Sequence, residues 1–196
     1  TNSAITLNNV KDYAVFDGSN DYITFGTKFD QMQQAGSFSV WLKPVNAHNN
    51  DIIFDNSDAS SANNGFTIRF EDPVSNKAVL KYGIWGSTDG SIITDEIWSE
   101  NEWQHLVTTY DGTTAKIYRN GTEVKSGALT ANSNAATYNA RFGWAANGND
   151  NKYDGLMDDV GIWNVALSAD QVSALYNSGT GKTVNTTNAW IERGSA

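Results

Sequence analysis

WQHLVTTYDGTTAKIYRNGTEVK, running from Trp103 to Lys125, is the stretch that decides the fold of this chain. Two tight turns divide it into three short strands, with Asp-Gly at 111–112 opening the first turn and Asn-Gly at 120–121 forming the second. Asn-Gly is a strong hairpin signal because both residues tolerate the positive φ that a type I′ turn requires. Between the turns, residues 115–119 alternate apolar and polar side chains, which is the period of a half-buried strand. The stretch therefore predicts an antiparallel three-stranded meander.

Other short apolar runs recur on both sides of the meander at intervals of roughly 8 to 15 residues, with no long helical periodicity between them. They lie at 14–16, 22–25, 37–43, 51–54, 65–70, 78–85, 138–144 and 155–163. Residues 17–21 are polar and turn-forming, which predicts that the first two runs pair as a hairpin. This spacing is typical of an antiparallel sandwich or jelly roll.

One helix is specified, at about 168–178. Ser168 is a good N-cap, Gln171 completes a capping box, and Gly179 is placed to end the helix. No break in composition precedes about residue 179, so we expect a single domain over 1–196, with a core of about 10–180 and a polar C-terminal extension at 181–196. The predicted fold is all-β: a two-sheet antiparallel sandwich with one short C-terminal helix.

Composition excludes several partners. The chain has 196 residues, a formal net charge of −9 and a pI of about 4.5, which argues against nucleic acid and anionic membrane surfaces, because clustered Lys and Arg drive binding to both. It contains no cysteine, which excludes disulfides and thiolate metal sites. No apolar run approaches the ~18 residues that a spanning helix needs, so no membrane insertion is expected. Because Thr1 is not followed by a leader pattern, we expect a mature product or a piece of a longer protein.

Three segments together resemble the laminin-G-like branch of the concanavalin A-like lectin/glucanase superfamily. They are AVFDGSNDYITF (14–25), EWQHLVTTYDGTTAKIYRNGTEV (102–124) and GLMDDVGIWNVALSADQVSALY (155–176). The resemblance implies a two-sheet jelly roll and a non-catalytic module of a secreted or surface protein. Such modules bind glycans or other cell-surface ligands, frequently with calcium. It also implies an extracellular or cell-surface location, with neighbouring domains in a longer polypeptide.

Oxygen-bearing side chains predict a calcium site. Asp17, Asn20 and Asp21 lie in the polar turn, and the resemblance implies a calcium-binding Asp at Asp158. Ca²⁺ takes six to eight oxygen ligands, which carboxylates and amides supply. Because successive strand residues face opposite sides, Asp158 and Asp159 are not expected to point at one ion. The alternative is that these residues only form turns and accept hydrogen bonds.

Two loops, at 85–90 and 144–154, combine aromatic rings with amides and carboxylates. Sugars need this chemistry, because a flat ring covers their C–H face while polar groups bind their hydroxyls, and loops on a rigid sandwich often carry such sites. The alternative is that the two tryptophans fill the core at strand ends. The predicted ligand-binding residues are Trp85, Asp89, Trp144, Asn147, Asn149, Asp150 and Tyr153.

Three acids, Glu96, Glu100 and Glu102, precede the meander but lack the alternating spacing of glucanase acids, so no catalytic residue is predicted. The sequence therefore favours a lectin-like module that binds a glycan or another cell-surface ligand with calcium. One alternative is an assembly module of a virion, tail or surface layer, and another is a glycoside hydrolase. A groove with paired carboxylates would favour the hydrolase, and a large apolar patch would favour assembly.

Overall fold

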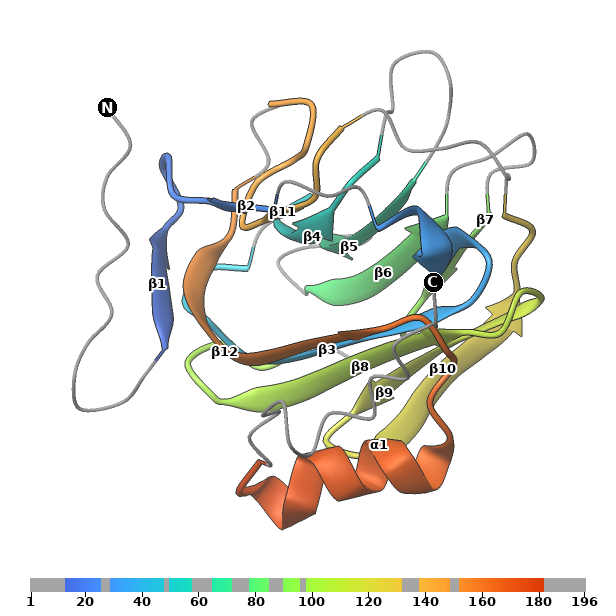
Figure 1. Ribbon diagram of the computed structural model, residues 1–196. Coiled ribbons are helices and arrows are strands. Elements are labelled where there is room, and N and C mark those ends of the chain that lie inside the picture. The colour runs from blue at the N-terminus through green and yellow to red at the C-terminus, as the bar shows by residue number, and fades with distance from the viewer. Residues whose placement is uncertain are drawn as a thin grey trace.

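The computed structural model describes residues 13–25, 29–47, 50–57, 65–71, 78–84, 90–95, 98–131, 138–148 and 152–181. Its strands form two six-stranded antiparallel sheets that stack as a sandwich (Figure 1). Sheet A has the order β1 (Ala14–Asp17), β12 (Asp154–Trp163), β3 (Gly36–Pro44), β8 (Gln104–Tyr110), β9 (Thr114–Arg119) and β10 (Thr122–Ala128). Sheet B has the order β2 (Ile23–Thr24), β11 (Arg141–Phe142), β4 (Ile52–Asp55), β5 (Phe66–Glu71), β6 (Val79–Ile84) and β7 (Gly90–Ile93). The predicted all-β sandwich is confirmed.

The predicted meander forms β8, β9 and β10, which are consecutive neighbours in sheet A. Asn120 and Gly121 have φ of 51° and 79°, the left-handed values that the Asn-Gly turn requires. At the other turn, the Asp111 carboxylate accepts hydrogen bonds from the backbone N–H groups of Thr113 (2.9 Å) and Thr114 (2.7 Å). Local turn chemistry therefore sets the register of half of sheet A.

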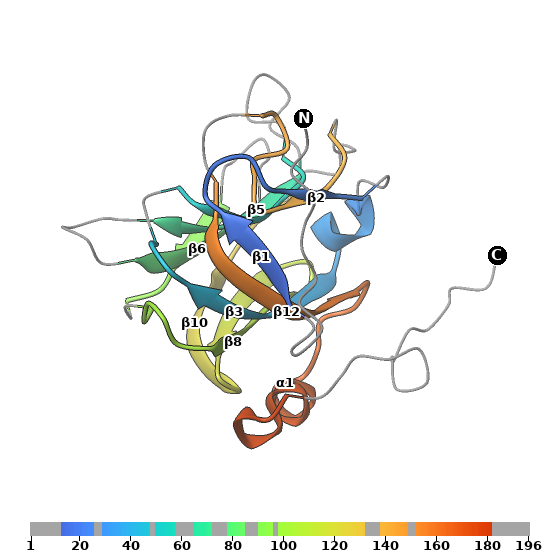
Figure 2. The ribbon, with the colours of Figure 1, turned by 90° about the vertical axis from the view of Figure 1, so that its left-hand side faces the viewer.

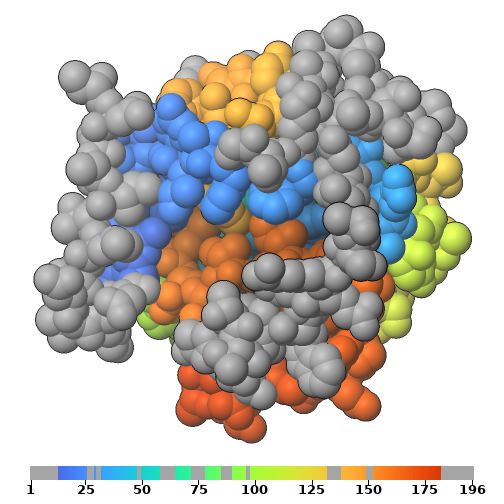
Figure 3. Space-filling model, in the orientation of Figure 1, coloured from blue at the N-terminus to red at the C-terminus, as the bar shows by residue number. Residues whose placement is uncertain are grey.

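The strands at the beginning of the chain do not form the predicted hairpin. β1 pairs with β12 in sheet A, with Phe16 opposite Gly155, whereas β2 pairs with β11 in sheet B, with Ile23 opposite Phe142. Figure 2 shows β1 alongside β12, and their blue and orange surfaces adjoin in Figure 3. The prediction was wrong because residues 18–22 carry the chain from one sheet to the other instead of turning it back.

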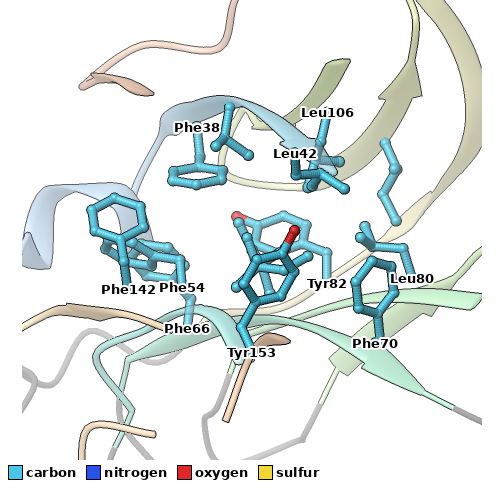
Figure 4. Packing of buried hydrophobic residues seen from close by; sticks show 14 of the residues in the cluster. Phe38, Leu42, Phe54, Phe66, Phe70, Leu80, Tyr82, Leu106, Phe142 and Tyr153 are labelled. Carbon is cyan, nitrogen blue, oxygen red and sulfur yellow. The ribbon is translucent and has the colours of Figure 1, made fainter. Parts of the chain in front are cut away.

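Aromatic and aliphatic side chains from both sheets meet in one core (Figure 4). Phe54 lies near its centre, with ring centroids 4.9 Å from Phe142, 5.0 Å from Phe66 and 5.2 Å from Phe38. All four rings are at most 1% exposed. Edge-to-face and stacked rings at these distances stabilise the sandwich beyond the area that they bury.

The predicted helix is α1 (Ala169–Tyr176), and both hydrogen bonds of its capping box form between Ser168 and Gln171. The buried Val172 of α1 packs with Val107, Tyr118, Trp163 and Leu167 in a second apolar cluster on the outer face of sheet A. Figure 1 shows α1 beneath that sheet. A 3₁₀ turn, η2 (Asn177–Gly179), follows, and another, η1 (Asp30–Gln33), precedes β3. None of the described helices is long and apolar enough to cross a membrane.

Candidate functional site

A β-bulge in β12 shapes the candidate site. Asp158 pairs with Trp41 and Gly161 pairs with Ser39, so β12 uses one more residue than β3 over this interval. Asp159 takes up the extra length with a φ of 45°, a left-handed value that is uncommon outside glycine but tolerated by Asp and Asn. Because the bulge interrupts the alternation of side chains, Asp158 and Asp159 line the same cavity. The prediction that they face opposite sides is wrong for this reason.

This cavity lies on the outer face of sheet A, beside the end of α1, and has a volume of about 330 Å³. That size falls within the range of ~300–1,000 Å³ that is usual for small-molecule sites. Its residues come from segments that are far apart in the sequence. The lining consists of Tyr13, Trp41, Trp103, Asp158, Asp159, Gly179, Thr180 and Gly181. We call this the outer cavity.

Aromatic stacking holds one wall of the outer cavity in place. Trp41 points outward because its neighbours Val40 and Leu42 are fully buried in the core. Its ring stacks on Tyr176 of α1, with centroids 5.8 Å apart and planes 22° apart, and also lies 5.1 Å from the ring of His105. These contacts fix a flat apolar surface at the edge of the cavity, as a sugar C–H face or a cation requires.

A second pair of rings completes the aromatic lining. The centroids of Tyr13 and Trp103 lie 5.9 Å apart with planes tilted by 59°. Both side chains are half-buried, and neither belongs to the core between the sheets. Trp103 directly precedes β8, so the predicted meander positions it, although its contact with Tyr13 could not be foreseen from the meander alone.

The described polar side chains of the outer cavity include two carboxylates. Among the described residues that line it, these two are Asp158 and Asp159. The Asp158 carboxylate accepts a hydrogen bond from the backbone N–H of Asp159 (2.8 Å). Partial burial raises the pKa of the Asp159 carboxyl, because desolvation disfavours its charged form. Within the described ranges, no side chain or backbone donor reaches that carboxylate.

His105 supports Trp41 from the side of β8. It is 2% exposed, and its Nε2 lies 2.8 Å from Ser39 Oγ. Its Nδ1 is buried and has no partner among the described residues. Burial lowers the pKa of His105 to about 4, so the ring is neutral near pH 7 and serves as a packed aromatic.

The residues predicted to bind calcium at the polar turn are engaged in forming that turn. Asp17 Oδ1 accepts hydrogen bonds from the backbone N–H groups of Ser19 (2.8 Å) and Asn20 (3.3 Å). Asp21 Oδ2 accepts one from the N–H of Asp17 (3.1 Å). Asp21 Oδ1, in contrast, is buried without a hydrogen-bond partner in the described part of the chain. That unpaired buried oxygen is the feature of the turn that would suit a bound cation.

The structure does not bring Asp158 to this turn. Asp17 pairs with Asp154, which places Asp158 four residues further along β12, roughly 13 Å away at ~3.3 Å per residue. A single ion therefore cannot be held by the turn and by Asp158 together. Among the described residues, no group of three or more His, Asp or Glu side chains is arranged to hold a metal.

The predicted ligand loops are only partly described. Trp144 is half-buried, its ring lies edge-on to Tyr22 at 5.4 Å, and Lys152 Nζ lies 5.0 Å from its centroid. Arg141 also lies over the Tyr22 ring, at 4.9 Å. Trp144 is thus part of a cation–π cluster at a sheet edge, and Asn147 is half-buried nearby in sequence. Trp85, Asp89, Asn149 and Asp150 lie outside the described residues.

Tyr153 is a core residue, so the prediction that it binds ligand is wrong. It is 1% exposed, with its ring edge-on to Phe16 at 5.8 Å and stacked on Phe70 at 6.4 Å. Its hydroxyl donates a hydrogen bond to the carbonyl of Leu156 (3.1 Å). An aromatic residue beside a polar loop has the same sequence pattern whether it enters the core or faces solvent.

The acids before the meander occupy a turn, not a strand. Glu100 lies within the turn, where its carboxylate accepts a hydrogen bond from the backbone N–H of Ala47 (3.0 Å), and Glu102 is exposed at its end. Glu96 lies outside the described residues. Glu100 and Glu102 therefore do not share a strand face in the way that glucanase acids do.

Solved structures with the same fold include several sugar-binding and toxin domains. Domain 4 of AbnA, an extracellular GH43 arabinanase from Geobacillus stearothermophilus, solved with arabinotriose, matches with 22% identity and a TM-score of 0.61 over 86% of this chain and 78% of that one. The binding domain of botulinum neurotoxin DC, in complex with SialylT, matches with 16% identity and a TM-score of 0.65 over 90% and 45%. A Bacteroides ovatus protein matches with 18% identity and a TM-score of 0.62 over 82% and 45%.

This chain thus spans about half the length of the Bacteroides and neurotoxin chains. Among curated proteins, no sequence matched it. A family model described as "Concanavalin A-like lectin/glucanases superfamily", of the laminin G type, matches residues 17–173, which is most of the chain and includes every strand from β2 to β12. The chain therefore belongs to the concanavalin A-like lectin/glucanase superfamily.

Proposed function

We propose that this domain is a non-catalytic, lectin-like module that binds a glycan in the outer cavity. The observation that carries the proposal is the combination of aromatic walls at Trp41 and Trp103 with carboxylates at Asp158 and Asp159 in one cavity. Apolar rings cover the C–H face of a sugar, and charge-assisted hydrogen bonds to carboxylates fix its hydroxyls. The ligand would be displayed outside the cell or on its surface, since glycan recognition by such modules takes place there.

The similar structures support this proposal through what they bind. The AbnA domain was solved with arabinotriose, and the neurotoxin domain with SialylT. Their TM-scores of 0.61 and 0.65 establish the common fold, whereas identities of 22% and 16% leave the ligand of this chain to be inferred from its own residues. The aromatic lining of the outer cavity provides that argument.

Two carboxylates in one cavity could also belong to a glycoside hydrolase, which needs a specific arrangement of the two groups. Hydrolysis uses two carboxyl groups that approach the glycosidic bond from different sides. Asp158 and Asp159 are consecutive residues of one bulge, and Asp158 is tied to the backbone of its neighbour. We propose that both bind the ligand from a single wall and that no turnover occurs.

The assembly alternative predicted a large apolar patch. Within the described ranges, the exposed large apolar side chains are four valines, each between 36% and 46% exposed: Val15, Val45, Val160 and Val165. Aromatic side chains, which are enriched at the cores of protein interfaces, are not in this group. The glycan proposal therefore has the stronger support.

Replacing Trp103 with alanine is expected to weaken binding of a glycan identified on an array by about 2 kcal/mol, or about thirtyfold, because a binding-site tryptophan is often an energetic hot spot. Isothermal titration calorimetry measures this loss of affinity for the glycan. Trp144→Ala, which alters the cation–π cluster instead, is the matched control and is expected to leave affinity unchanged. The reverse result, with only Trp144→Ala losing affinity, would move the glycan site to the loop that the sequence singled out.

We further propose that calcium stabilises the polar turn through Asp21 and Asp17. The supporting observation is that Asp21 Oδ1 is buried and has no hydrogen-bond partner among the residues that the structure describes. A ligand that binds only the folded state at 100 times its Kd adds ~2.7 kcal/mol to the free energy of unfolding. Melting in calcium is therefore expected several degrees above melting in chelator, and Asp21→Asn is expected to remove the difference. Equal melting temperatures of the unaltered protein in both buffers would exclude this site.

A further inference from the structure

The chain leaves α1 through a turn with an uncommon backbone. Residues 177–181, which we call the 177–181 turn, include four with a positive φ. They are Asn177 (49°), Ser178 (53°), Gly179 (91°) and Gly181 (68°). Positive φ usually occurs at single residues, because the Cβ atom of an L-amino acid crowds the backbone in that region. Such a run beside a cavity points to a conformation that serves a function.

This turn folds back onto the end of α1 and lines the outer cavity. Gly179, Thr180 and Gly181 are all lining residues. The backbone N–H of Gly181 donates a hydrogen bond to the carbonyl of Tyr176 (3.2 Å), and the N–H of Thr180 donates one to the carbonyl of Asn177 (3.2 Å). The turn therefore forms a closed wall of the cavity and is anchored to the helix.

The side chain of Asn177 holds the turn closed. Its Nδ2 donates one hydrogen bond to Thr180 Oγ1 (2.9 Å) and another to the carbonyl of Gly181 (2.9 Å). Thr180 Oγ1 in turn donates to the carbonyl of Asn177 (2.8 Å). An amide group has two N–H donors, and here both are used within the turn. Asn177 itself is exposed and is not a lining residue of the cavity.

The closed turn holds the Trp41 ring at two places. Tyr176, directly before the turn, stacks on the Trp41 ring with centroids 5.8 Å apart. Gly181, at the other end of the turn, lies at the edge of the same ring, where a Cβ atom would be 3.0 Å from Trp41 Nε1 and 3.5 Å from Asp159 Oδ2. The position of the aromatic wall relative to Asp159 therefore depends on the conformation of the turn.

We propose that Asn177 is a positioning residue of the outer cavity. Through its two hydrogen bonds it keeps Gly181 against the edge of Trp41, so that the cavity has its binding geometry before a glycan arrives. A wall ordered in advance favours affinity, because less conformational freedom is lost on binding. This inference rests on the proposed glycan-binding function and adds to it a residue that acts from outside the lining.

The first test needs no glycan and uses Asn177→Gly, which removes the amide donors, adds no charge and accepts positive φ. The Trp41 indole N–H signal is assigned in a ¹⁵N–¹H NMR spectrum as the one that Trp41→Phe removes. We expect Asn177→Gly to shift this signal, because Gly181 lies beside Trp41 Nε1. Melting curves are expected to stay close to those of the unaltered protein, since glycine is favoured at the end of a helix.

Two glycine variants serve as matched controls. Ser178→Gly lies in the same turn, where a φ of 53° suits glycine, and it leaves both Asn177 hydrogen bonds in place. Asn50→Gly makes the same replacement at another left-handed asparagine, with a φ of 68°, directly before the segment that leads into β4 of sheet B. Both are expected to leave the Trp41 signal where it is in the unaltered protein.

The second test measures binding of the same proteins to a glycan array that includes arabinotriose and sialylated oligosaccharides. Affinity for the saccharides that the unaltered protein binds is expected to fall about tenfold in Asn177→Gly, as it would if one molecule in about ten held the turn closed. Ser178→Gly and Asn50→Gly are expected to bind as the unaltered protein does.

The outcomes separate this inference from the proposed function. An unshifted Trp41 signal in Asn177→Gly, or unchanged affinity in that variant, would overturn the positioning role and leave glycan binding intact. An equal shift in Ser178→Gly would show that the Asn177 hydrogen bonds are not what holds the wall, and would overturn it too. Absence of binding of the unaltered protein to every saccharide on the array would overturn both the function and the inference.

Discussion

Replacing Phe54 with alanine is expected to lower the free energy of unfolding by about 3–5 kcal/mol, the usual cost of removing a buried aromatic side chain. Phe54 is fully buried, and its ring lies within 5.2 Å of those of Phe38, Phe66 and Phe142. It therefore connects β3 of sheet A with β5 and β11 of sheet B. Urea unfolding followed by tryptophan fluorescence measures the change.

Phe54→Leu is the matched control, because it preserves most of the apolar volume and is expected to cost clearly less than the alanine variant. Val165→Ala, at a side chain that is 46% exposed, is expected to stay within about 0.5 kcal/mol of the unaltered protein. A loss for Phe54→Ala no larger than that for Val165→Ala would contradict the central position of Phe54 in the core.

The parts of the fold that follow from local chemistry could be predicted from the sequence. The turn at Asn120 needs positive φ, and the capping box at Ser168 needs only residues three positions apart, so both are specified within a few residues. The pairing of β1 with β12 has no such signal. The same polar turn that could close a hairpin also allows the chain to change sheets, and only packing against the rest of the sandwich decides between them.

The outer cavity could not be predicted for a related reason. Tyr13, Trp41, Trp103 and Asp158 are distant in sequence and become neighbours only through the strand order of sheet A. The residue of the bulge with positive φ is an aspartate, Asp159, and not a glycine, so strict alternation along β12 was the reasonable expectation. The family resemblance singled out Asp158, but for a calcium site at the polar turn that the strand register does not allow.

The stability of the unaltered protein is expected to change little between about pH 4 and pH 6.5, because two buried groups oppose each other there. Burial raises the pKa of Asp55 from 3.8 to about 6, so the folded state holds a proton that the unfolded state has lost, and stability falls as pH rises through this range. Burial lowers the pKa of His105 from 6.5 to about 4, so the unfolded state holds the extra proton, and stability rises with pH.

At 1.36 kcal/mol per pKa unit, each group changes the free energy of unfolding by about 3 kcal/mol across this pH range. Replacing either group should therefore make the pH dependence caused by the other group measurable. In Asp55→Asn, the free energy of unfolding is expected to increase from pH 4 to pH 6.5, whereas in His105→Gln it is expected to decrease over the same interval. Urea unfolding at several pH values measures both slopes, with melting as a check that each variant is folded. Parallel slopes in the two variants would contradict the opposed titrations.

Opposite slopes would also show that the two titrations act independently, since Asp55 and His105 lie on different sheets. Asp55 ends β4 of sheet B, where its carboxylate accepts hydrogen bonds from Ser57 Oγ (2.6 Å) and from the backbone N–H of Ala146 (2.7 Å). His105 lies in β8 of sheet A and stacks against Trp41 at the outer cavity. In the double variant both contributions are absent, so its unfolding free energy is expected to be as insensitive to pH as that of the unaltered protein. A slope in the double variant as steep as in either single variant would mean that a third group governs this range.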